Sequence, residues 1–139
     1  MAMTMHLDIV SAETELFSGL AEIVVAPAIM GEVGIHARHT PMLTPLKPGE
    51  VKITKPGGEE EYIYVSGGMM EVQPSVVTIL SDTAVRAQDL DEAAAMEAKQ
   101  AAEEAIANRE SDMDLAEAQS KLLEAVAQIR MIENFRKKR

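Results

Sequence analysis

The chain has 139 residues, a length that suggests one domain or a small domain with an appendage. Its net charge of −10 disfavours a nucleic-acid partner, because such a binder must neutralise phosphates with Lys and Arg. The absence of cysteine excludes disulfides, thiolate nucleophiles and thiolate-bound zinc.

No apolar run approaches the roughly 18–20 residues that a membrane-spanning helix needs. Residues 1–8 lack the basic start and apolar core of a signal peptide. We therefore expect a cytosolic protein without direct membrane insertion, which could still join a membrane complex through protein contacts.

The composition changes sharply along the chain. All eight Gly and all six Pro lie before position 75, whereas 13 of the 53 residues from Ala87 onward are Ala. Gly and Pro punctuate turns, while Ala favours helix. This break predicts a β-rich first part over residues 1–86 and a helical second part over residues 87–139.

The first part shows alternating, β-branched segments separated by turn residues. The strongest signal is a hairpin in which Pro56, Gly57 and Gly58 connect two strands. The segments that read as strands are residues 5–10, 23–25, 51–55, 62–65 and 76–80. Many short strands with regular turns predict a sandwich or flattened barrel.

The second part predicts two helices joined by a short loop. Asp89 and Glu92 have capping-box spacing, which starts the first helix near residue 90 and lets it run to about residue 107. Residues 108–111 form the loop, and Asp112 or Asp114 caps the second helix. A loop this short makes the two helices antiparallel.

One continuous seam is expected along the second helix, with small side chains opposite it on the first. The second helix supplies Leu115, Ala118, Leu122, Ala125, Ile129 and Ile132. The first helix supplies Ala94, Ala98, Ala101 and Ala105. Ala buries little area, so the pair is held weakly. Two interpretations stay open: a permanently closed hairpin, or one that opens when another surface offers the second helix a better groove.

Residues that could support chemistry do not assemble into a catalytic set. Glu32, His36 and His39 lie close together in a Gly-interrupted loop and suggest either a metal site or, more simply, a polar contact loop. No nucleophile elbow and no phosphate-cradling loop are present. We expect no enzyme and no cofactor. A rival class, a carbohydrate- or metal-binding sandwich with a helical oligomerisation tail, requires exposed aromatic residues or a metal cluster.

The last four residues, 136–139, are all basic. Cations at a helix C-terminus are stabilising whatever the function, because the helix dipole is negative there. The alternative, functional explanation is that these basic residues bind an acidic docking site on another protein.

Several segments together resemble the epsilon subunit of the bacterial ATP synthase. They are the start around residues 5–19, the loop at 31–35 with 39–44, the stretch 64–74, and 80–87 with 89–93. The similarity covers essentially the whole chain in unbroken order. It implies a ten-stranded β-sandwich followed by an antiparallel helical hairpin. It also implies a non-catalytic rotor subunit in the central stalk of the proton-translocating enzyme, peripheral on the cytoplasmic face of the bacterial inner membrane.

The resemblance also implies partners for each part. The sandwich would bind the gamma subunit and rest on the ring of c subunits, with Glu32 and His39 facing that ring and Arg38 adding a charge beside it. Just before His39, Ala37 and Arg38 stand where the family often has Pro and Gly. The hairpin would be regulatory: in an extended state it reaches the alpha and beta subunits and obstructs ATP hydrolysis. The basic residues facing acidic residues of beta would be Arg130, Arg136, Lys137, Lys138 and Arg139.

Some members of the family bind ATP through a pattern of Leu or Ile, Asp, two variable residues, Arg and Ala. Here Asp91 matches the Asp, but Ala94 stands where the Arg would be. Arg is the natural charged partner for a phosphate. We therefore expect weak or absent nucleotide binding.

Overall fold

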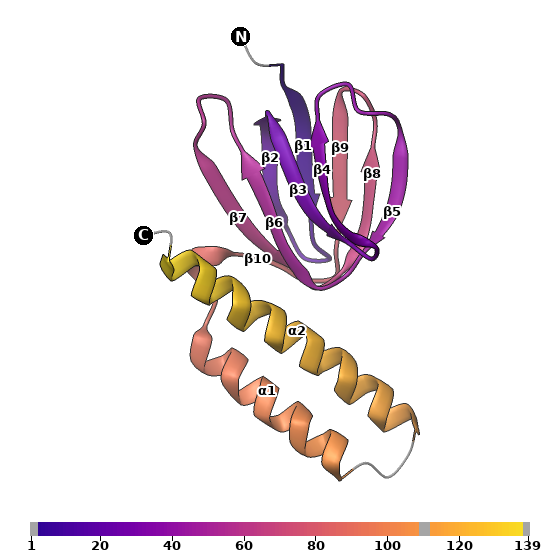
Figure 1. The fold of residues 1–139 in the computed structure, drawn as a ribbon, viewed down its shortest axis with the longest axis vertical. Helices are drawn as coiled ribbons and strands as arrows, with labels where there is room; N and C mark the ends of the chain where they lie inside the picture. Colours follow the sequence, from indigo (N-terminus) through magenta and orange to yellow (C-terminus); the bar gives the residue numbers. More distant parts are fainter. Residues whose placement is uncertain (1–2, 109–111, 138–139) are drawn as a thin grey trace. The chain divides into compact units, whose positions relative to one another are not determined.

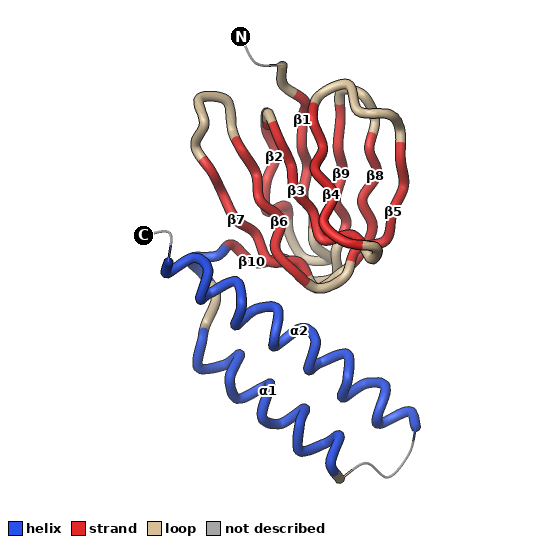
Figure 2. The backbone as a smooth tube through the Cα atoms, in the orientation of Figure 1, coloured by secondary structure: helices blue, strands red, loops and turns tan. Residues whose placement is uncertain are grey.

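The structure, a computed structural model, describes the backbone of residues 3–108 and 112–137, and side chains of the last helix from Leu115 to Arg136. The chain divides into two compact units, Met1–Arg86 and Ala87–Arg139. The first unit is built of strands and the second of helices (Figures 1 and 2). The predicted fold, a ten-stranded sandwich followed by a two-helix hairpin, is confirmed.

The first unit contains ten strands. The alternation of apolar and polar residues predicted β1, β3, β6, β7 and β9. It did not predict the other five strands, which are short or contain Gly or Pro. The bounds are β1 (Met5–Val10), β2 (Glu15–Ala21), β3 (Ile23–Ala28), β4 (Gly31–His36), β5 (Met42–Leu46), β6 (Gly49–Thr54), β7 (Glu60–Val65), β8 (Gly68–Val72), β9 (Val76–Leu80) and β10 (Ala84–Arg86).

These strands pair in the order β10-β7-β6-β3-β5-β8-β9-β1-β2, with β4 paired to β3. Among the described residues, every ladder is antiparallel except the one between β1 and β9. The step from β3 to β5 rests on one pair, Ala28 with Leu46. The sheet folds over at this narrow step, so β4, β3, β6, β7 and β10 form one layer and β5, β8, β9, β1 and β2 the other (Figure 1).

The core fills the space between the layers with aliphatic side chains. On β1, Leu7 and Ile9 are fully buried while the residues between them are half-buried, which is the period of two expected of a strand with one covered face. Ile53 on β6 and Ile79 on β9 are buried in the same cluster. The alternation that predicted these strands therefore also identified their inward faces.

The turn from β7 to β8 requires glycine. Gly67 and Gly68 have φ angles of +115° and +121°, a region that side chains rarely adopt. A Cβ on Gly68 would also lie 2.0 Å from the carbonyl oxygen of Leu80. Gly68 therefore lets β8 and β9 approach closely at this corner.

Side chains join the two ends of the sheet path, where no backbone ladder connects β10 with β2. Arg86 donates a hydrogen bond of 2.7 Å to the carbonyl oxygen of Leu16, and its Nε lies 3.6 Å from Glu61. Glu61 also pairs with Lys55 at 2.9 Å, and Lys55 lies 5.9 Å from the centre of the Phe17 ring. These contacts attach β2 to the opposite layer.

The second unit begins with a short 3-10 turn, η1 (Ala87–Asp89), followed by α1 (Glu92–Ala107) and α2 (Asp112–Lys137). The predicted cap of the first helix was wrong. Asp91, not Asp89, is the N-cap, and its carboxylate accepts a 3.2 Å hydrogen bond from the backbone N–H of Ala94. Asp89 lies within η1, so the chain turns once more before the helix starts.

Alanine supplies much of the seam between the helices. Ala95 and Ala102 of α1 are buried, whereas the predicted seam residues Ala94, Ala98, Ala101 and Ala105 are exposed. The prediction was wrong by one position, which on a helix is a rotation of about 100°. On α2 the predicted Ala118, Ala125 and Ile132 are buried, Leu115, Leu122 and Ile129 are half-buried, and Met131 is buried without having been predicted.

Candidate functional site: an apolar sheet face and a helical hairpin

The layer of β5, β8, β9, β1 and β2 has an apolar outer face. Outward positions of neighbouring strands form rows, one of which aligns Pro45, Met69 and Leu80. Five large apolar side chains on this face are between 37% and 67% exposed: Leu20, Leu43, Met69, Val76 and Leu80. Apolar surface gathered on one side of a protein is typical of a contact with another protein.

A polar trio lies within this face, formed by His6 and Asp8 of β1 and Ser18 of β2. Asp8 accepts a 2.7 Å hydrogen bond from the Ser18 hydroxyl and lies 3.0 Å from Nε2 of His6. The Ser18 hydroxyl lies 3.3 Å from the same Nε2. In a nucleophilic triad the carboxylate and the hydroxyl contact different ring nitrogens, so this geometry is not that of a triad.

The trio fixes a negative charge on the apolar face. The hydrogen bond from Ser18, and secondarily the contacts with His6, lower the pKa of Asp8 against the opposing effect of burial. The strand registers align Asp8 with Ser18, Thr78 and Glu71, so a partner that covers this face would meet a polar row beside the apolar ones.

The three residues predicted to face a ring lie at two ends of β4. Glu32 is the second residue of the strand, beside the β3–β4 turn, whereas Arg38 and His39 follow the other end. At about 3.3 Å per residue, Glu32 is already roughly 13 Å from His36. The structure therefore brings Arg38 and His39 together but not Glu32.

The turn beside Glu32 is apolar and exposed. Ile29 is 56% exposed and Met30 is 97% exposed. Ile29 and Met30 were not predicted from the sequence, because two apolar residues after Pro27 and Ala28 look like a continuation of the strand. Their exposure depends on the tight turn into β4.

The β4–β5 loop is held by backbone contacts. Arg38 has a φ of +67° and donates its backbone N–H to the carbonyl oxygen of Pro74 at 2.7 Å. Nδ1 of His39 lies 2.7 Å from the carbonyl oxygen of Thr40. Among residues 3–108 and 112–137, no group of three His, Cys, Asp or Glu side chains is arranged to hold a metal ion.

The residues predicted as a remnant nucleotide site take part in helix capping. The Asp91 carboxylate accepts the Ala94 N–H at the start of α1, and both residues are exposed. Ala94 offers only a methyl group. This end of α1 therefore has an acidic side chain where a phosphate would need a cation.

The predicted basic contacts lie on α2. Arg130 is exposed, and Arg136 forms an ion pair with Glu92 of α1. Lys138 and Arg139, like the side chain of Lys137, lie outside the described residues. The structure thus gives one of the predicted cations, Arg136, an acidic partner inside the hairpin.

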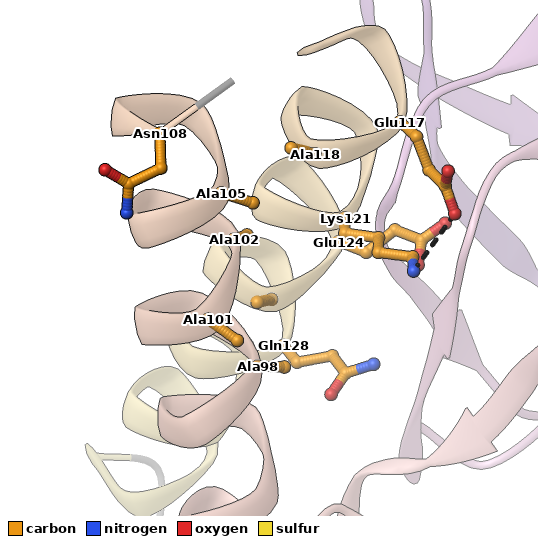
Figure 3. Close-up of a pocket in the computed structure, with 11 residues that line it drawn as sticks. Ala98, Ala101, Ala102, Ala105, Asn108, Glu117, Ala118, Lys121, Glu124 and Gln128 are labelled. Carbon is orange, nitrogen blue, oxygen red and sulfur yellow. Dashed lines mark ion pairs between the residues drawn. The ribbon is translucent and has the colours of Figure 1, made fainter. Parts of the chain in front are cut away.

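A shallow groove of about 700 Å³ runs along the hairpin (Figure 3). Small side chains line it, with Glu117 and Lys121 paired at 3.1 Å on its rim. The alanines are Ala98, Ala101, Ala102, Ala105, Ala118 and Ala125. A lining of methyl groups can receive an apolar surface but supplies few groups for acid–base chemistry.

None of the helices described between residues 3 and 137 is both long enough and apolar enough to span a membrane.

A β-sandwich with exposed apolar side chains on one face, followed by a helical hairpin, is typical of the class of proteins that act by binding other proteins. The model of the ATP synthase delta/epsilon chain β-sandwich domain matches residues 4–87, and that of the long α-helix domain matches residues 88–133. The chain belongs to the ATP synthase delta/epsilon family, and its role is that of a non-catalytic, epsilon-type subunit.

Two curated relatives are similar over almost their whole length. The ATP synthase epsilon chain 1 of Methylococcus capsulatus is 67% identical, covering 100% of this chain and 99% of the relative. The ATP synthase epsilon chain of Nitrosococcus oceani is 62% identical, covering 99% of each.

Solved structures share the fold at low identity. A chain of the Euglena gracilis mitochondrial ATP synthase has a TM-score of 0.80 at 19% identity, covering 89% of this chain and 78% of that one. A chain of the Tetrahymena thermophila central stalk and c-ring structure has a TM-score of 0.63 at 12% identity, covering 94% of this chain and 97% of that one.

Proposed function

We propose that the sandwich couples the central stalk to the membrane sector by binding the gamma subunit through its apolar outer face. The observation that carries this proposal is the group of exposed apolar side chains on adjacent strands, including Leu43 and Leu80. Such a surface is costly in water and gains by being covered. The Asp8 carboxylate within it would favour a partner that offers a hydrogen-bond donor.

The ring of c subunits is proposed to meet the loop ends of the same unit. Glu32 would contact it together with the exposed Ile29 and Met30, which add apolar area to a polar contact. Arg38 and His39, at the other end of β4, belong to the same prediction from family resemblance. Substitutions at the two ends must therefore be tested separately.

The hairpin is proposed to be a removable brake on ATP hydrolysis. In a compact state it would fold against the sandwich, and in an extended state α2 would reach the alpha and beta subunits. Arg130, Arg136 and the basic tail, residues 137–139, would face acidic residues of beta. The alanine seam supports this role, because it makes the closed hairpin only weakly favoured over an open one.

We propose weak or absent ATP binding by the isolated chain. The Asp91 carboxylate is used to cap α1, and Ala94 supplies no charge for a phosphate. Isothermal titration calorimetry should detect no binding in the micromolar range, and a micromolar dissociation constant would overturn this part of the proposal.

The proposed location is peripheral, on the cytoplasmic face of the bacterial inner membrane as part of ATP synthase. This follows from membership of the family, whose relatives are named as chains of that enzyme.

Affinity for the gamma subunit tests the docking face. Leu80→Asp would place a charge in the apolar row and should weaken binding at least about 10-fold, or roughly 1.4 kcal/mol. Met96→Asp is the matched control, since Met96 is 52% exposed but lies on α1. Equal affinity of both variants for gamma would remove the support for this face.

Glu32→Gln and His39→Gln separate the two ends of β4. Each variant is incorporated into the complex, and the fraction of assembled catalytic sector that stays bound to the c ring is measured. Loss with Glu32→Gln alone assigns the contact to the β3–β4 turn, and loss with His39→Gln alone assigns it to the β4–β5 loop. Retention in both variants counts against the proposed ring contact.

The brake is tested by reversing the charges of the tail, residues 136–139. ATP hydrolysis by the assembled complex should then rise, because the extended α2 would meet like charges on beta. Unchanged hydrolysis would contradict the proposed contact.

A further inference from the structure

One ion pair joins the two helices at the end of the hairpin farthest from their connecting loop. Glu92 is the first residue of α1, and Arg136 lies in the last turn of α2. The guanidinium of Arg136 donates a hydrogen bond to the Glu92 carboxylate. These residues are 44 positions apart in sequence, so only the folded hairpin brings them together.

The pair lies beside a shallow cavity of about 500 Å³. Leu90, Ile132 and Phe135 contribute apolar walls. The Glu92 side chain is 39% exposed and the Arg136 side chain 62% exposed. An ion pair next to apolar surface is less screened than one in open water, but this exposure keeps its contribution modest.

The rest of the interface makes even a modest contribution important. Four of the buried side chains along the hairpin are single methyl groups, those of Ala95 and Ala102 on α1 and of Ala118 and Ala125 on α2, and the larger buried ones are Met131 and Ile132 near the end of α2. A hairpin held by so little apolar area has a small free-energy difference between its closed and open states. One ion pair then shifts the ratio of those states measurably.

We propose that Glu92 is a latch that holds the hairpin closed and withholds Arg136 from an acidic partner surface. The inference rests on the proposed function only for the identity of that surface, the catalytic sector. A guanidinium bound to Glu92 has fewer donors left for a second carboxylate. Docking of α2 on an acidic surface therefore competes with the latch, and Glu92 sets how readily the brake engages.

Both charges also sit where helix dipoles favour them, an acid at the start of α1 and a base at the end of α2. Those dipole effects act on each helix separately, whereas a latch couples the two residues. A double-mutant cycle of Glu92→Gln, Arg136→Gln and the double variant separates the two explanations.

The first experiment uses the full chain alone. The chain contains no cysteine, so Gln100→Cys on α1 and Ser120→Cys on α2, both exposed, give a unique pair of spin labels. Double electron–electron resonance then measures the distribution of distances between the two labels, and from it the ratio of open to closed hairpins. Glu92→Gln should raise that ratio roughly two- to fivefold, the range of an exposed pair, and the effect should shrink near 1 M salt.

Glu97→Gln is the matched control, because it removes an equal charge from an exposed position of the same helix. It should leave the ratio unchanged. Equal effects of Glu92→Gln and Glu97→Gln would overturn the latch. So would a cycle in which the two single substitutions simply add, since that result means the residues act through the helix dipoles alone.

A second experiment keeps failure of the latch distinct from failure of the brake. In the assembled complex, Glu92→Gln should increase inhibition of ATP hydrolysis, while Glu97→Gln should not. If Glu92→Gln opens the isolated hairpin but leaves hydrolysis unchanged, the latch is supported and the proposed brake is contradicted. If the isolated hairpin does not respond, the latch is overturned whatever the complex does.

Discussion

The two units bury very different side chains. In the sandwich, Leu7, Ile9 and Ile63 are completely buried, and each such side chain stabilises a fold by about 1.5–3 kcal/mol. In the hairpin, the seam residues Ala102 and Ala125 each bury little more than one methyl group, worth about 0.8 kcal/mol. A large aliphatic core gives the sandwich a fixed shape, whereas two helices packed largely through alanine can separate at a low cost in free energy.

The outer surfaces differ in the same way. The sandwich displays its apolar residues on adjacent strands of a rigid layer, where Leu80 and Met69 are cross-strand partners. The hairpin displays single exposed residues such as Met96 and Leu123. A surface of constant shape suits permanent attachment, and a marginal helical pair suits a contact that forms and breaks.

The largest expected effect comes from removing core volume in the sandwich. Leu7→Ala should lower the free energy of unfolding by about 2–5 kcal/mol, because lost burial and a residual cavity add. Urea unfolding followed by tyrosine fluorescence reports on this unit, since both tyrosines lie on β7. Leu20→Ala, at a position 54% exposed, should change stability by no more than about 0.5 kcal/mol. Similar losses for both variants would contradict the claim that buried aliphatic side chains stabilise the sandwich.

A backbone clash tests the stability of the sandwich without changing its core side chains. Gly68→Ala should cost about 2–4 kcal/mol, because the new Cβ meets the Leu80 carbonyl and φ is positive. Gly34→Ala is the control, since nothing lies within 4 Å of its Cβ, and its effect should stay within about 1 kcal/mol. The same unfolding assay measures both, and a neutral Gly68→Ala would show that the corner relaxes freely.

A smaller effect is expected from overfilling the seam of the hairpin. Ala125→Leu should destabilise the helical pair by about 1–3 kcal/mol, because Ala125 is only 3% exposed. Ala116→Leu places the same side chain at an exposed position of α2 and should be nearly neutral. Thermal melting followed by circular dichroism reports the helices, while tyrosine fluorescence reports the sandwich. If both signals shift together in Ala125→Leu, the two units unfold as one cooperative unit, and the hairpin is not a separately marginal element.

The smallest effect at neutral pH concerns Tyr62, which is 8% exposed. Burial, and secondarily its hydrogen bond to Glu60, raises the pKa of Tyr62 from 10.0 to about 12. Because the folded-state pKa lies above the unfolded value, this stabilisation is complete below pH 10 and is lost as the pH rises toward about 12. Phenolate absorbance measures the titration, and Tyr62→Phe should make stability less dependent on pH in that window. An identical pH dependence in Tyr62→Phe would refute the assignment.

Some features of the candidate site were predictable because they depend on local patterns. Alternation predicted β1 and β9, and Val76 and Leu80, at the outward positions of β9, belong to the apolar face. The face itself was not predicted, because it depends on which strands become neighbours. The pairing of β1 with β9 joins residues about 70 positions apart in the chain.

Other predictions failed for reasons of angle and turn geometry. The α1 seam was placed on Ala94 and Ala98 instead of Ala95, because nearly every position of an Ala-rich helix fits a small-residue pattern. Asp89 and Asp91 both offered a cap, and only the extra 3-10 turn selected Asp91.

By itself, the sequence determined the division near Arg86, the β-rich and helical character of the two parts, and membership of the family. These follow from residue type and spacing along the chain, which act locally or through recognisable motifs. Only the tertiary structure decided that Glu32 lies far from His39, that exposed apolar side chains of four strands share one face, and that Arg136 meets Glu92. Each of these depends on contacts between segments that are far apart in the chain. Strand register, strand order and helix rotation determine those contacts, and the local sequence pattern does not distinguish between the possible arrangements.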